Sequence, residues 1–137
     1  MNSKEIFSIS EDIHVLTFKA SSFPQGIAEA HTKIQSQFSN IHEKTIFGIS
    51  RPENGNINYW SAIKLTHYGN TDDFGVGQFT ISKGEYISIM VNNYIEDPLS
   101  ISSAFQSLTR HPGIDPEAYC IEWYLGEKDV KCMIKLI

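Results

Sequence analysis

Hydrophobic residues along this chain follow two spacings, one typical of β-strands and one typical of α-helices. Runs rich in β-branched and aromatic residues predict strands at residues 13–18, 45–50, 58–65, 120–125 and 130–137. Residues 78–80 and 86–94 are interpreted as one further strand around a turn at residues 82–84. Apolar residues three or four positions apart predict two helices, one containing Ile27, Ala30, Ile34 and Phe38 and the other containing Ile101, Ala104, Phe105 and Leu108. Pro24 and Pro98 precede these stripes, and each is interpreted as the first residue of its helix because proline lacks an N–H that the first turn leaves unpaired.

The same order of elements occurs twice along the chain. Residues 11–68 and 78–137 each contain a strand, a helix and two strands, and a loop rich in Gly and Asp joins them. This order predicts an α+β fold of two βαββ repeats with pseudo-twofold symmetry, in which an antiparallel sheet carries two helices on one face. The whole chain, residues 1–137, is interpreted as one domain, and residues 1–10 as a leader with room for one more strand.

A shift of 74 positions superposes the two repeats, so that Pro24 falls on Pro98 and Gly48 falls on Glu122. Seams between packed units are favoured positions for pockets. The repeats therefore predict a groove along the seam, with an acidic residue on one side only.

Composition and charge disfavour several classes of function. The net charge is −5 and the eleven Lys and Arg residues are scattered, which disfavours a nucleic-acid surface. No apolar run approaches the ~20 residues of a membrane span, and residues 1–5 lack a signal-peptide pattern. We therefore expect a cytoplasmic protein with no membrane and no direct nucleic-acid contact. Cys120 and Cys132 are expected to be free thiols.

Known catalytic and metal-binding motifs do not occur in the sequence. There is no Gly-x-Ser-x-Gly, no phosphate-binding loop and no His-Glu-x-x-His, so no cofactor and no metal are predicted. His31 borders the stripe of the first helix and is expected to be a packed or half-exposed histidine rather than a ligand. Asp72 and Asp73 are interpreted as an exposed acidic loop.

Glu122 is the chemically unusual residue of the strand near the C-terminus. It is a single carboxylate in the run Tyr119 to Leu125, among aromatic and aliphatic residues and a thiol. Burying a carboxylate without a partner costs several kcal/mol, so its presence calls for a partner or a function. The simpler alternative is a glutamate on the water-facing side of an edge strand.

Three motifs resemble the GyrI-like family, also described as the bacterial transcription-activator effector-binding domain family. They are Lys83-Gly84-Glu85-Tyr86 before a strand, Pro98 to His111 as the second helix, and Glu122-Trp123-Tyr124 before the last turn. The resemblance implies the two-repeat fold, and many members bind amphipathic, often cationic or aromatic molecules in the groove between repeats. The acidic residue central to that groove maps onto Glu122. Several members are fused to DNA-binding domains, whereas this chain resembles a stand-alone effector-binding domain.

The resemblance and the aromatic content predict a site for a lipophilic cation or an aromatic molecule. Aromatic faces attract a cation by about 0.5–2 kcal/mol each, and a carboxylate neutralises it. The predicted ligand-binding residues are Glu122, Tyr124, Trp60, Tyr59, Tyr86 and Phe105. Core packing is the simpler alternative for each aromatic residue, and it is favoured for Phe105 and Trp123.

Two other classes of function remain open. Some relatives of the family hydrolyse reactive electrophiles, which implies Glu122 as general acid or base and Tyr124 as the residue that orients a water. The family also includes an inhibitor of DNA gyrase, which implies a protein partner for acidic loops that are otherwise simply solvated. The acidic loop residues are Glu53, Asp72, Asp73, Glu127 and Asp129. Small-molecule binding is favoured over both alternatives.

The face on which Glu122 lies depends on the register of the last hairpin. A two-residue loop pairs Gly126 with Asp129 and leaves Glu122 on the side opposite a clean apolar face. A three-residue loop pairs Gly126 with Val130 and places Glu122 on one face with Cys132. The hydrophobic pattern favours the first register. The resemblance favours an inward Glu122, which is the prediction adopted.

Overall fold

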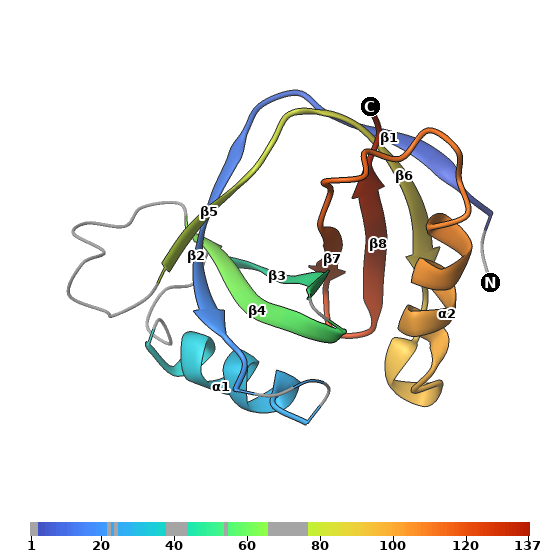
Figure 1. The fold of residues 1–137 in the computed structure, drawn as a ribbon. Helices are drawn as coiled ribbons and strands as arrows, with labels where there is room; N and C mark the ends of the chain where they lie inside the picture. The colour runs from blue at the N-terminus through green and yellow to red at the C-terminus, as the bar shows by residue number, and fades with distance from the viewer. Residues whose placement is uncertain (1–2, 22, 24, 38–43, 54, 66–76) are drawn as a thin grey trace. The chain divides into compact units, whose positions relative to one another are not determined.

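The structure of the protein, a computed structural model, describes residues 3–21, 23, 25–37, 44–53, 55–65 and 77–137. The chain forms two compact units. The middle unit comprises residues 12–81, and the terminal unit comprises residues 1–11 and 82–137. Each unit contains antiparallel strands and one α-helix, which confirms the predicted α+β class (Figure 1).

The middle unit is an antiparallel sheet with a helix packed against it. Its elements are β2 (Ile13–Lys19), α1 (Ile27–Gln37), β3 (Lys44–Glu53), β4 (Asn56–Leu65) and β5 (Gly77–Ile81). The strand order is β3-β4-β2-β5. α1 contacts β2 and β4, and Ala20, Ala30 and Tyr59 form a buried cluster there.

His31 connects α1 to β4 through both nitrogens of its ring. Nδ1 lies 2.5 Å from Ser61 Oγ, and Nε2 lies 2.8 Å from the Tyr59 hydroxyl. Burial lowers the pKa of His31 to about 4. His31 is therefore a packed histidine that is neutral near neutral pH, as its position beside the helix stripe predicted.

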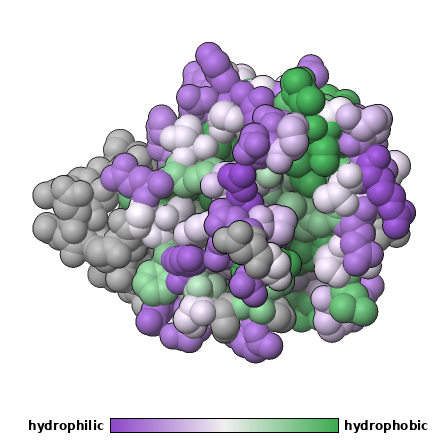
Figure 2. Space-filling view, viewed as in Figure 1, coloured by the Kyte–Doolittle hydropathy of each residue, from purple (hydrophilic) through white to green (hydrophobic). Residues whose placement is uncertain are grey.

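The terminal unit has the same general plan. Its elements are β1 (Glu5–Ile9), β6 (Gly84–Val91), the 3-10 turn η2 (Tyr94–Glu96), α2 (Ser100–Leu108), β7 (Cys120–Leu125) and β8 (Asp129–Lys135). The strand order is β1-β6-β8-β7, and α2 packs against β6 and β8. The core under α2 consists of Ile87, Ile89, Val91, Ala104, Leu108, Val130, Cys132 and Ile134. In Figure 2, hydrophobic surface forms a band over the region where β8 lies in Figure 1.

Each unit includes an edge strand from a distant part of the sequence. β1 pairs with β6, so that Phe7 lies opposite Tyr86, and the predicted leader does add a strand. β5 pairs with β2, so that Gly77 lies opposite Thr17. The two parts of the strand predicted at 78–80 and 86–94 therefore belong to different units.

Two predicted boundaries near α2 are wrong. The strand predicted to reach Tyr94 ends at Val91, because Asn93 adopts a left-handed conformation with φ 52° and turns the chain. α2 begins at Ser100 rather than at Pro98. The Asp97 carboxylate accepts the Leu99 N–H at 3.2 Å, so residues 97–99 form a turn before the helix. In the other half, α1 begins at Ile27, and the residues assigned to its two ends, Pro24 and Phe38, lie outside the described residues.

Candidate functional site

The register of the β7–β8 hairpin determines where Glu122 lies. Leu125 pairs with Asp129 and Glu122 pairs with Cys132, so the loop consists of residues 126–128. The register with a two-residue loop, which the hydrophobic pattern favoured, is therefore wrong. The loop has the predicted three residues, but it lies one position earlier than predicted. Gly126 has φ 73°, a conformation that glycine adopts without steric strain, and it therefore lies inside the turn rather than in the ladder.

Glu122 is buried on the face of its sheet that carries α2. Cys132, its cross-strand partner, is fully buried in the core under α2. Because residues directly opposite in a ladder share a face, the Glu122 side chain lies on that same face, and the residue is only 7% exposed. The Tyr124 hydroxyl donates a hydrogen bond to Glu122 Oε1. A carboxylate is thus held in apolar surroundings with a phenol beside it.

Tyr94, which is not among the predicted ligand-binding residues, also belongs to this site. Its ring meets the ring of Tyr124 edge to face, with centroids 5.5 Å apart and an interplanar angle of 63°. Its backbone N–H donates to the carbonyl of Lys128 at 3.0 Å, which fixes η2 against the hairpin loop. Burial raises the pKa of the Tyr94 hydroxyl, and the charge of Glu122 raises it further. The available signal was Asn92-Asn93, a pair of residue types that commonly end a strand and form turns.

Phe105 contributes the helix side of the same region. It lies on α2 and packs against the same core cluster as Tyr94 and Tyr124, and all three aromatic residues are half-buried. We call Glu122, Tyr124, Tyr94 and Phe105 the Glu122 site. A buried carboxylate with partly exposed aromatic rings around it has the features that favour a cation over a neutral or anionic molecule.

The Cys132 thiol of β8 does not add a nucleophile to this site. Cys120 and Cys132 are free cysteines, as predicted. Burial raises the pKa of the Cys132 thiol, and the charges of Glu122 and Cys120 raise it further. Cys132 therefore stays protonated and behaves as an apolar core residue.

Tyr86, which was predicted to line the ligand site, lies on the other face of the same sheet. Cys132 pairs with Ile89 as well as with Glu122, and Tyr86 is three positions from Ile89, so its side chain points to the opposite side. Its hydroxyl donates to the Ser82 carbonyl at 2.6 Å. Trp123 shares that face, with its ring centroid 5.8 Å from the centroid of Phe7. Tyr86 is 1% exposed, and Trp123 is half-buried.

Tyr59 and Trp60 belong to the middle unit and point to opposite faces of β4, because they are consecutive residues of one strand. Tyr59 is 1% exposed and faces α1, where it meets His31. Trp60 lies on the other face, opposite Lys19 in the β2–β4 ladder. One wall of a ligand site therefore cannot contain both aromatic side chains.

Glu53 and Asp129, two of the acidic loop residues that the structure describes, accept hydrogen bonds at turns. The Glu53 carboxylate accepts from the Asn58 amide at 3.0 Å, and the Asp129 carboxylate accepts from the Asn93 N–H at 3.3 Å. Asp72 and Asp73 lie outside the described residues. Across the described ranges, His, Cys, Asp and Glu side chains form no group of three that could hold a metal ion. Neither described helix is long and apolar enough to cross a membrane.

No family model matches the sequence, and no curated protein matches it. Solved structures share the fold at low sequence identity. An integron cassette protein from Vibrio cholerae is 12% identical and has a TM-score of 0.64, with 98% of this chain and 95% of that chain covered. SAV2435, solved with bound tetraphenylphosphonium, is 9% identical and has a TM-score of 0.60, with 97% and 94% covered. A hydrolase from Listeria innocua is 12% identical and has a TM-score of 0.56, with 99% and 92% covered. At these identities the likeness shows the fold alone, and that fold is consistent with the effector-binding fold implied by the resemblance.

Proposed function

We propose that this protein binds small amphipathic cations at the Glu122 site. The observation that carries the proposal is the position of Glu122, a 7%-exposed carboxylate on the core-facing side of β7 with the Tyr124 hydroxyl and the Tyr94 ring beside it. A lipophilic cation satisfies both parts of such a site. Its charge is attracted by the carboxylate in a region of low dielectric constant, and its apolar surface replaces water on the aromatic rings.

Tetraphenylphosphonium is a suitable test ligand, because SAV2435 has this fold and binds it. We expect saturable binding to the wild-type protein, measured by isothermal titration calorimetry. Glu122→Gln keeps the shape of the side chain and removes its charge, so binding should weaken by about 10- to 100-fold, equivalent to roughly 1.4–2.8 kcal/mol. The matched control is Glu127→Gln, which removes the same charge from an exposed residue of the hairpin loop.

Neutral triphenylphosphine oxide provides the second control, and it should bind the wild-type protein much more weakly than the cation does. Tyr94→Leu should weaken cation binding by about 0.5–2 kcal/mol, because one aromatic face is lost while apolar volume is kept. Equal affinities of wild type and Glu122→Gln for tetraphenylphosphonium would contradict the role of the carboxylate. Whether a ligand also contacts Tyr59, Trp60 or Tyr86 stays a prediction.

Hydrolysis is the second candidate function. The hydrogen bond from Tyr124 to Glu122 is the specific observation that favours it, because a phenol beside a carboxylate can orient water for a general base. If the protein is a hydrolase, it should turn over a strained epoxide, and chromatography measures the product. Glu122→Ala should abolish this turnover. Turnover that survives in Glu122→Ala would remove Glu122 as the catalyst.

A further inference from the structure

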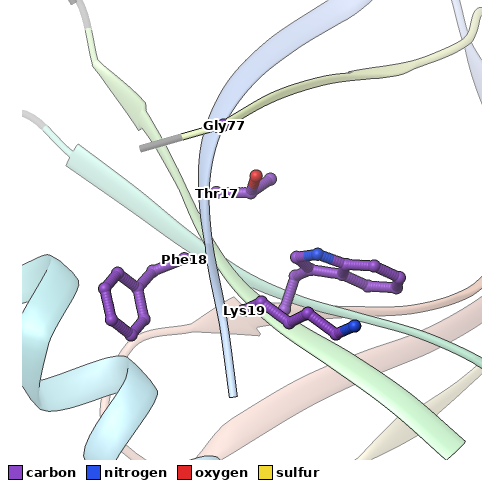
Figure 3. A pocket seen from close by; sticks show the side chains of 5 residues that line it. Thr17, Phe18, Lys19 and Gly77 are labelled. Atoms are coloured by element: carbon purple, nitrogen blue, oxygen red, sulfur yellow. The ribbon is translucent and has the colours of Figure 1, made fainter. Parts of the chain in front are cut away.

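The middle unit contains a cavity that is separate from the Glu122 site in sequence and in unit. It has a volume of about 350 Å³ and is lined by Thr17, Phe18, Lys19, Trp60 and Gly77. The volume falls within the range of small-molecule sites, about 300–1,000 Å³. The side chains of Thr17 and Lys19 point to one side of β2, and that of Phe18 points to the other, toward α1 (Figure 3).

The ladder brings the polar residues of this cavity together. Lys19 lies opposite Trp60 in the β2–β4 pairing, and Thr17 lies opposite Gly77 in the β2–β5 pairing. A Cβ atom at position 77 would lie 2.8 Å from Thr17 Oγ1, closer than real Cβ contacts occur. A glycine at this position therefore keeps the space beside the Thr17 hydroxyl open.

Two groups on this wall lack polar partners in the described part of the chain. Thr17 is only 7% exposed, and no described group forms a hydrogen bond with its hydroxyl. Lys19 is exposed, and no carboxylate among the described residues lies within ion-pair distance of its ammonium group. The ammonium lies 5.8 Å from the centroid of the Trp60 ring. The wall thus offers one positive charge, one hydroxyl and one large aromatic surface.

We infer that this cavity binds a small aromatic carboxylate. The carboxylate accepts hydrogen bonds from the Lys19 ammonium and the Thr17 hydroxyl, and the aromatic body packs against the Trp60 indole. A cationic ligand is disfavoured here, because the Lys19 ammonium already occupies the region over the Trp60 ring. In this inference Trp60 packs against the aromatic body of an anionic ligand, whereas the sequence predicted it for a site that takes a lipophilic cation or an aromatic molecule.

Phenylacetate is the probe that tests this inference, and phenylacetamide is its neutral counterpart of the same shape. Binding is measured by calorimetry and by the shift of the Trp60 indole N–H signal in two-dimensional NMR, with Trp60→Phe used to assign that signal. We expect phenylacetate to bind, and phenylacetamide to bind at least about tenfold more weakly. The reason is that a hydrogen bond to a charged group contributes more binding free energy than one between neutral groups. Lys19→Gln should weaken phenylacetate binding by a similar factor. Thr17→Val, which keeps the shape and removes the hydroxyl, should weaken it by a smaller factor.

Lys64→Gln is the matched control, because it removes the same charge from an exposed lysine of β4 that does not line the cavity. Gly77→Ala should reduce binding by filling the space beside Thr17. The inference is overturned by any of three results: no saturable binding of phenylacetate, equal binding of phenylacetamide, or unchanged affinity in Lys19→Gln. Tetraphenylphosphonium binding should be the same in Lys19→Gln and in wild type, so failure at one site is distinguishable from failure at the other.

Discussion

Lowering the pH from 7 to 4 should reduce the free energy of unfolding by about 3 kcal/mol through the single residue His31. Burial lowers the pKa of His31 from 6.5 to about 4 in the folded protein. Its two ring nitrogens face the hydroxyls of Ser61 and Tyr59, which carry no charge to offset an imidazolium. The folded state therefore favours the neutral ring.

The direction of this effect follows from proton binding. Below pH 6.5 the unfolded chain binds a proton at His31, whereas the folded chain does not bind it until the pH nears 4. The contribution of the neutral ring to stability is complete above the unfolded pKa and decreases as the pH falls through this window. Below about pH 4 both states are protonated, and this contribution no longer changes.

Urea unfolding of wild type and His31→Gln at several pH values isolates the effect from that of the carboxylates. The difference in stability between the two proteins should change by about 3 kcal/mol between pH 7 and pH 4. His14→Gln is the matched control, because it makes the same substitution at an exposed histidine. A difference between wild type and His31→Gln that stays constant across the window would contradict the lowered pKa.

Periodicity predicted the elements whose apolar residues face one side only. The apolar stripe of the second helix is an example, since Ala104 and Leu108 are fully buried on the core-facing side of α2. The periodicity did not predict where that helix begins. The helix begins at Ser100 instead of Pro98, after a turn in which the Leu99 N–H donates to the Asp97 side chain.

The last hairpin shows why its register could not be derived from hydrophobicity. β7 is buried on both faces, with Ile121 4% exposed on one side and Glu122 7% exposed on the other. Alternation carries information only when one face is wet, so the apolar pattern favoured the register that the structure contradicts. Gly126 lies in the turn of the observed register, with φ 73°.

Contacts between residues far apart in the sequence account for the rest of what sequence reasoning missed. The Ser61–His31–Tyr59 hydrogen bonds join residues 28 and 30 positions apart, and no local motif announces them. Lys19 meets Trp60 only because of the β2–β4 register. Glu122 and Tyr124 were predicted together because residues two apart on a strand share a face, a relation that needs no tertiary information.

The buried carboxylate should reduce the stability of the fold that holds it. Replacing Glu122 and Tyr124 together by Met and Phe removes a charged group and the hydroxyl that solvates it, and it keeps the apolar volume. We expect the double variant Glu122→Met/Tyr124→Phe to unfold at higher urea concentration than wild type. The gain is on the order of 1–4 kcal/mol, as for buried ionic groups replaced by apolar side chains.

The same double variant should lose affinity for tetraphenylphosphonium by at least about tenfold, whereas Glu127→Gln should match wild type in both stability and binding. A more stable protein that no longer binds the cation would mean that Glu122 is retained for its ligand and not for the fold. The opposite result, a double variant that is less stable than wild type, would make the Glu122–Tyr124 pair a structural element of the core. In that case a buried carboxylate on β7 would be explained without a ligand, and the cation-binding proposal would lose its main support.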